Sequence, residues 1–270
     1  MTRLMNRRPS REAGLMLTIL PFALVIAAYL AASAARLAVN VDDKLLPWPS
    51  AFAEAIRVMA FEPDKRSGDY LFWLDSYASL LRLLAGLGIA AAISLVLGTA
   101  IGLIPYVGRT LSAFVAVLSM VPPLAILPIL FITLGLGEPA KITLIVIGIA
   151  PCLVRDLAFR VRELPEELLI KAQTMGASTW QVILRVVLPQ LLPRLLSGLR
   201  LSLGPAWLFL IAAEAIASTE GLGYRIFLVR RFLAMDVILP YVAWITLLAF
   251  VLDQLLALAA RRCFPWASRP

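Results

Sequence analysis

The sequence predicts an all-α polytopic membrane protein with about six transmembrane helices. Of its 270 residues, 61% are hydrophobic and 16% are charged, whereas a soluble domain is roughly 45–50% apolar and about 25% charged. The apolar residues form separate runs of roughly 20 residues or more, the length that crosses about 30 Å of hydrocarbon. Basic residues flank these runs, so we attribute the net charge of +8 to membrane topology and not to nucleic-acid binding.

The first expected span covers residues 15–37 and follows an arginine-rich tail, residues 1–14. A cleaved signal peptide begins in the same way, but about 22 apolar residues suffice to cross the bilayer, so we expect an uncleaved span. Residues 40–75 form a polar outer loop with a short interfacial helix that Ser50 would cap. The sequence leaves open whether this loop is a spacer or a docking surface.

The second expected span, residues 76–106, is rich in glycine and alanine. Its Gly98-x-x-x-Gly102 pair would let a neighbouring helix approach closely. The fourth expected span, residues 138–158, carries a kink at Pro151.

The third expected span, residues 110–136, is interrupted by Pro122-Pro123 and by Pro128. Mid-span prolines release backbone carbonyls, which is tolerated where these groups face protein or a water-filled cavity. The three prolines are therefore candidates for lining a pathway. A packing kink with no role in transport explains them equally well.

The fifth expected span, residues 191–217, contains Glu214 near its outer end. An ionisable side chain there is costly unless it is paired or hydrated, and so it is a functional candidate. Residues 218–236 then form an outer loop with Gly221 and Gly223. We favour a structural tie from Glu214 to a nearby loop over a contact with a transported solute.

The sixth expected span, residues 237–260, precedes a short tail, residues 261–270. With both termini inside, fifteen of the 25 basic residues lie on the inner side, in the sense of the positive-inside rule. The outer loop before this span carries three arginines that would contact lipid headgroups or attract an anion, and of these two roles we favour headgroup contact. These are Arg225, Arg230 and Arg231.

A polar stretch, residues 164–189, lies between the fourth and fifth spans and has the pattern of two short helices. Gly176 would end the first helix, and Ser178 with Gln181 matches a capping box that starts the second. One face of the first helix is apolar, and one face of the second is too. These faces comprise Leu168, Leu169, Ala172 and Met175, and then Trp180, Ile183, Leu184 and Val187. The pattern fits a hairpin resting on headgroups and a docking surface for a partner protein alike.

The chain contains no histidine, and its two cysteines, Cys152 and Cys263, are far apart. This composition excludes Ser-His-Asp catalysis, histidine ligands and a CxxC metal site. The sequence has no GxxxxGK[ST] pattern and therefore no P-loop for ATP. We expect no enzyme activity, no metal site and no cofactor in this chain.

The hairpin stretch also carries a family resemblance. Nine residues separate Gly176 from Val186-x-Leu188-Pro189, a spacing that resembles the cytoplasmic "EAA" loop of ABC importer permeases, EAA-x3-G-x9-I-x-L-P. Residues 170–172 occupy the EAA positions, where only Ala172 matches and no acidic residue stands at 170. Over roughly residues 47–260 the chain resembles the permeases of the nitrate/sulfonate/taurine/bicarbonate importer group.

This resemblance implies a type I ABC importer permease in the bacterial inner membrane, with one transmembrane domain over residues 15–260 and a coupling loop over residues 160–190. It also implies a second copy of the chain, two ATPase subunits that hold ATP-Mg, a periplasmic or lipid-anchored solute-binding protein, and a small, mostly anionic solute. The expected ATPase-coupling residues are Glu166, Glu167, Lys171, Ala172, Met175, Gly176, Ala177, Ser178, Trp180 and Pro189. The candidates for the pathway or its gate are Pro122, Pro123, Pro128, Glu214, Gly221 and Gly223.

Two other functions compete with the importer interpretation. A secondary transporter that works without ATP needs ionisable coupling groups inside the membrane, for which Glu214 and Asp253 qualify, but the sequence shows no inverted repeat. An intramembrane enzyme is poorly supported because histidine and paired carboxylates on one span are missing. Copurification of an ATPase distinguishes the importer from both.

Overall fold

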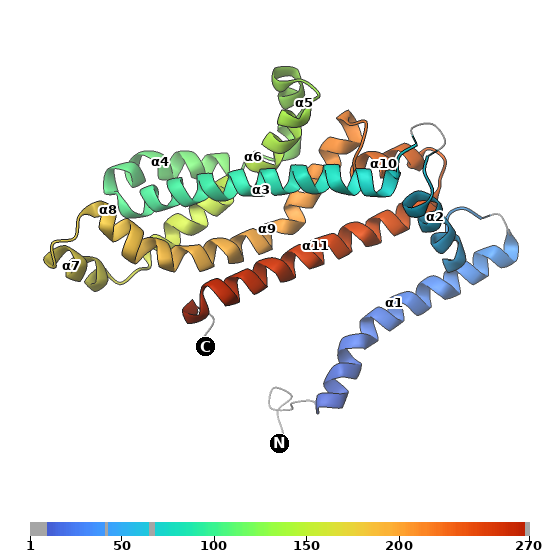
Figure 1. Ribbon diagram of the computed structural model, residues 1–270, viewed down its shortest axis with the longest axis horizontal. Coiled ribbons are helices and arrows are strands. Elements are labelled where there is room, and N and C mark those ends of the chain that lie inside the picture. The colour runs from blue at the N-terminus through green and yellow to red at the C-terminus, as the bar shows by residue number, and fades with distance from the viewer. Residues whose placement is uncertain (1–9, 41–42, 65–67, 268–270) are drawn as a thin grey trace.

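The computed structural model describes residues 10–40, 43–64 and 68–267, and its regular elements within these ranges are all helices (Figure 1). Among the described residues, five helices are long and apolar enough to cross a membrane, and a bent pair of shorter helices makes up to six. This confirms the predicted fold class and the number of spans. The five are α1 (Arg11–Val39), α3 (Leu71–Leu103), α6 (Glu138–Arg162), α9 (Leu188–Ala217) and α11 (Met235–Cys263).

The expected third span is two helices, which corrects the prediction of one interrupted helix. Helices α4 (Pro105–Leu118) and α5 (Pro123–Leu134) meet at 95°. The break is at Pro122, which has extended backbone angles and precedes the first residue of α5. A residue before a proline is kept out of the helical region, so two consecutive prolines end a helix. Pro128 lies inside α5.

Helix α6 is packed between α3 and α9 and contributes much of the buried apolar core. The predicted glycine pair on α3 makes the close approach possible. A Cβ atom at Gly98 would lie 2.7 Å from the Cβ of Leu157, and one at Gly102 would lie 2.4 Å from the Cβ of Val161. The expectation of close helix packing at these glycines is confirmed.

Helix α1 diverges from the bundle (Figure 1), and no residue of its most apolar 18-residue window is buried. It is tied to the segment before α2 (Pro49–Phe61) by hydrogen bonds from Tyr29 to the carbonyl of Pro47 (2.6 Å) and from Ser33 to that of Leu46 (2.8 Å). The expected Ser50 cap is wrong. Helix α2 begins at Pro49, whose missing N–H and fixed φ suit the first helical position.

The bundle has two distinct ends (Figure 1). One end carries α7 (Glu166–Thr174) and α8 (Thr179–Val182), and the first residues of α1 and the last residues of α11 point toward it. The other end carries α2 and α10 (Leu222–Arg230). A π-helical turn, η2 (Ile183–Val187), joins α8 to α9, and a 3-10 turn, η3 (Pro265–Ala267), follows α11.

Candidate functional site

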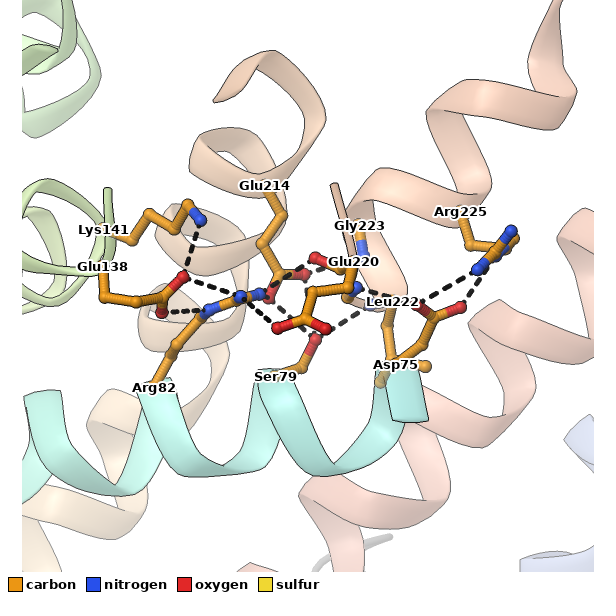
Figure 2. Close-up of polar contacts among 11 residues, drawn as sticks. Asp75, Ser79, Arg82, Glu138, Lys141, Glu214, Glu220, Leu222, Gly223 and Arg225 are labelled. Carbon is orange, nitrogen blue, oxygen red and sulfur yellow. Dashed lines mark hydrogen bonds and ion pairs between the residues drawn. The ribbon is translucent and has the colours of Figure 1, made fainter. Parts of the chain in front are cut away.

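Three polar side chains of α3 form a buried stripe at the end of the bundle that carries α10 (Figure 2). Asp75, Ser79 and Arg82 occupy positions i, i+4 and i+7, on one face of the helix. Their residues are 0%, 0% and 2% exposed. Charged groups inside a membrane protein are costly unless they are paired, and the partners of this stripe come from α6, α9, α10, α11 and the segment before α10.

Arg82 lies at the centre of this network. Its Nη1 donates to Oε1 of Glu214 at 2.7 Å and to the backbone carbonyl of Glu220 at 3.0 Å. Its Nη2 donates to Oε1 of Glu138 at 2.8 Å, and Lys141 Nζ donates to the same oxygen at 2.9 Å. One guanidinium therefore links α3 to α6, to α9 and to the segment before α10.

The N-terminus of α10 is held by the same stripe. The first N–H groups of a helix have no partner within that helix, and here side chains accept from three successive ones. Gly221 N donates to Asp75 Oδ1 (2.8 Å), Leu222 N to Ser79 Oγ (2.9 Å) and Gly223 N to Glu214 Oε2 (2.9 Å).

The two predicted glycines of this segment meet the predicted glutamate. Gly221 has a φ of +120°, and a Cβ atom there would lie 2.6 Å from the Glu214 carboxylate. A Cβ at Gly223 would lie 2.7 Å from the carbonyl oxygen of Ile211. Only glycine fits both the backbone angle and the space at 221. Glu214 thus makes the tie to the loop that the sequence analysis favoured.

Sequence reasoning missed the α3 side of the network. Asp75 was assigned to the outer loop 40–75, but α3 begins at Leu71, so this carboxylate is inside the helix. Arg82 and Lys141 were passed over, although a lone basic residue within a predicted span is the signal that exposes such a site.

The preference for headgroup contact is wrong for Arg225. Its Nε donates to Asp75 Oδ2 at 2.7 Å. Burial is the largest single influence and lowers the pKa of Arg225, but the hydrogen bond and the charge attraction to Asp75, with smaller electrostatic contributions from Tyr241 and Tyr224, together raise it above its ordinary value. Arg225 is therefore a charged partner inside the network. Arg230 and Arg231 lie over the rings of Phe227 and Phe232.

At the opposite end, backbone hydrogen bonds fix the α7–α8 hairpin. Ala177 N donates to the carbonyl of Ala172 at 3.0 Å, and Gly176 N donates to that of Gln173 at 2.9 Å, the two bonds of a Schellman motif. Gly176 has the required positive φ, +81°. Ser178 and Gln181 form the expected capping box. The predicted helix stop and helix start are both confirmed.

The side chains of the hairpin are mostly exposed. Leu169, Ala172 and Ala177 pack against the core, whereas Met175 is 79% exposed and Trp180 is 65% exposed. Each expected apolar face is therefore partly packed on the core and partly exposed, and both alternatives left by the sequence, headgroup contact and a docking surface, remain compatible with it. Glu166, Glu167, Lys171 and Ser178 are exposed as well.

The second hairpin helix is not a separate element, which corrects another expectation. One helical run extends from Thr179 to Ala217 through η2. Pro189 lies just after this π-helical turn. Its missing N–H and its ring disturb the α-helical hydrogen bond to Arg185, and Leu188 N donates to the carbonyl of Ile183, five residues back. The α8 half of the hairpin and Glu214 therefore lie on one continuous helix.

The family is identified by comparison with known proteins. Residues 87–265 match the family described as "Binding-protein-dependent transport system inner membrane component". The chain belongs to this family. It is an ABC importer permease, as the resemblance implied.

Individual relatives of this permease include members named for taurine and for bicarbonate transport. It is 41% identical over 199 residues to the taurine transport system permease protein TauC of Escherichia coli, covering 73% of this chain and 72% of that one. It is 33% identical to the bicarbonate transport system permease protein CmpB of Synechococcus elongatus, covering 69% and 67%. The inward-facing MetNI methionine ABC transporter shares the fold, with a TM-score of 0.58 at 22% identity, over 74% of this chain and 99% of the other.

Proposed function

We propose that this permease forms, with a second copy of itself, the membrane pathway of an ATP-driven importer for a small sulfonate-type anion. Relatives named for taurine and for aliphatic sulfonates support this class of solute. Two separate ATPase subunits would bind at the α7–α8 end, and a solute-binding protein would deliver solute at the α10 end. The α7–α8 end, with the inward ends of α1 and α11, is then cytoplasmic.

The observation that carries this proposal is the α7–α8 hairpin. Its backbone is fixed by a Schellman motif and a capping box, yet Met175 and Trp180 leave most of their apolar surface uncovered. A rigid backbone that presents exposed large side chains suits docking to a partner. Glu166, Glu167 and Lys171 supply charges around this apolar surface.

The continuous helix from Thr179 to Ala217 gives the two ends a mechanical connection. ATPase subunits that open and close would contact the hairpin differently in the two states, and this difference in contact free energy would drive the change of the permease. The helix would carry the displacement to Glu214 and hence to the segment Glu220–Gly223, the candidate outer gate.

The secondary-transporter alternative is disfavoured by two ion pairs. Glu214 bonds to Arg82, and Asp253 accepts two hydrogen bonds from Arg200, both at 2.8 Å. A coupling carboxylate must bind and release a proton or an ion during each cycle. Both candidate carboxylates are instead held by permanently charged guanidinium groups.

The test begins with affinity purification of the tagged chain from its native membrane, followed by liposome uptake of radiolabelled taurine. We expect a P-loop ATPase in equal amount and uptake that needs ATP. Replacing Gly176 by valine should abolish ATP-driven uptake but leave membrane insertion intact, because the left-handed turn is lost. Gly204→Val, at a glycine with open space around it, is the control. A chain that purifies alone and transports without ATP would refute the proposal.

A further inference from the structure

Helices α4 and α6 are joined by two arginine–serine hydrogen bonds near the α7–α8 end of the bundle. Arg155 Nη1 donates to Ser119 Oγ at 2.7 Å, and Arg162 Nη2 donates to Ser112 Oγ at 3.0 Å. Arg155 and Arg162 are seven residues apart, and so are Ser119 and Ser112, with the order of the serines reversed. The two hydrogen bonds therefore form a two-step ladder between antiparallel helices.

Within the described part of the chain, neither of these two arginines forms an ion pair with a carboxylate. A third arginine of α6, Arg160, takes both of the nearby carboxylates, Asp156 at 3.7 Å and Glu163 at 2.9 Å. Among the residues that the structure describes, no carboxylate lies within 4.0 Å of Arg155 or Arg162. A guanidinium has five N–H donors, and these two groups use only one or two of theirs on protein oxygens.

A cavity of about 520 Å³ lies at this ladder, and both arginines line it. Most of the remaining wall is apolar, although Ser112 and Asp156 also line it, and Asp156 is paired with Arg160 at 3.7 Å. The apolar part includes Val115 and Ala116 of α4, and Val154, Ala158 and Phe159 of α6. Cys152 also lines the cavity, so its thiol reports on what occupies the space.

We propose that this cavity binds an oxyanion between Arg155 and Arg162, with an apolar tail against its walls. The two residues are seven positions apart, about 10 Å along the helix, and their flexible side chains can donate to one anion from two sides. The oxyanion is either the sulfonate of the solute on its way to the cytoplasm or the phosphate of a lipid. Basic pockets between transmembrane helices on the cytoplasmic side bind lipid headgroups. The solute source rests on the proposed function, and the lipid source does not.

The first arm of the test measures maleimide labelling of Cys152 in purified Cys263→Ser permease, in nanodiscs of phosphatidylcholine. Ethanesulfonate should slow labelling in a saturable way, relative to chloride at the same ionic strength. Arg155→Gln or Arg162→Gln should each weaken this protection about tenfold, because each removes charge-assisted hydrogen bonds. Arg262→Gln, an exposed arginine at the end of α11, should leave protection unchanged. The Lys variants of Arg155 and Arg162 should retain part of it.

The second arm replaces phosphatidylcholine by phosphatidylglycerol and omits ethanesulfonate. Labelling that is slower in phosphatidylglycerol than in phosphatidylcholine, and that returns to the fast rate in Arg155→Gln/Arg162→Gln, would identify the phosphate of an anionic lipid, unneutralised by choline, as the oxyanion. Labelling of Cys152 that neither anion slows in the Cys263→Ser permease, with both arginines intact, would overturn the proposal. Protection that persists in a folded double variant would overturn it as well. Because labelling requires no ATPase, failure of ATP-driven uptake would reject the proposed function without deciding this site.

Discussion

The two ends of the bundle differ in which groups stabilise them: buried side chains at one end and the backbone itself at the other. At the α10 end, charged side chains of α3 and α9 are buried and bonded to one another and to the backbone of the segment 220–223. At the α7–α8 end, the backbone bonds to itself and large side chains such as Trp180 face outward. We therefore expect substitutions at the first end to act mainly on stability, and substitutions of the exposed side chains at the second end to leave stability largely unchanged.

The largest expected effect is that of Arg82→Met. It leaves Glu214, which is fully buried, without its counter-charge, and breaking a buried pair from one side costs about 3–5 kcal/mol. Thermal unfolding in detergent should show a strongly lowered melting temperature or no folded protein. The double variant Arg82→Met/Glu214→Gln should recover part of the loss, because no charge is stranded at Glu214. Equal damage in the single and double variants would contradict this pairing.

The next largest effect is expected for Gly221→Ala. The new methyl group would meet the Glu214 carboxylate at 2.6 Å with φ at +120°, so strain and overpacking together should cost about 2–3 kcal/mol. Gly204→Ala, where nothing lies within 4 Å of the new atom, is the matched control in the same melting experiment. Similar melting temperatures for the two variants would show that the segment is not constrained as described.

Trp180→Ala should show the difference between the two ends most clearly, because it should weaken binding to the ATPase subunit without lowering stability. Its side chain is largely exposed, so the free energy of unfolding should stay within about 0.5 kcal/mol of wild type. Affinity for the ATPase subunit, measured by titration in nanodiscs, should fall about thirtyfold, as for an aromatic anchor residue. Unchanged affinity would remove Trp180 from the docking surface.

The smallest effect is expected for Ser178→Ala. Loss of the N-cap side chain costs about 1 kcal/mol, and it acts only on the start of α8. Hydrogen exchange should quicken at the amide of Gln181, which donates to Ser178 Oγ, while exchange at Gly223 stays slow. Faster exchange at both sites would mean that the two ends are not independently held.

What the sequence predicts well is local in the chain. The apolar spans, the stop at Gly176 and the capping box at Ser178 each depend on residues within a few positions of one another. Glu214 was singled out because a lone charge in a span is unusual. Its partner Arg82 is 132 residues away, and no pattern in one sequence pairs such distant groups. The 95° turn at Pro122 also lay beyond prediction, since prolines show where a helix ends but not where the chain goes next.

The π-helical turn between the hairpin and α9 has a consequence for angular phase. In an α-helix each residue turns the chain by about 100°, so Trp180 and Glu214, on one helix, keep a fixed angle to each other. A π-helical turn accommodates about one extra residue. Because η2 (Ile183–Val187) lies between Trp180 and Glu214, it changes the angle between their two side-chain directions around the helix axis from the value that a regular α-helix would give. Deleting one residue of η2 would rotate the hairpin by about 100° relative to an intact outer network, and would turn Trp180 to a different direction while the contacts of Glu214 stay in place.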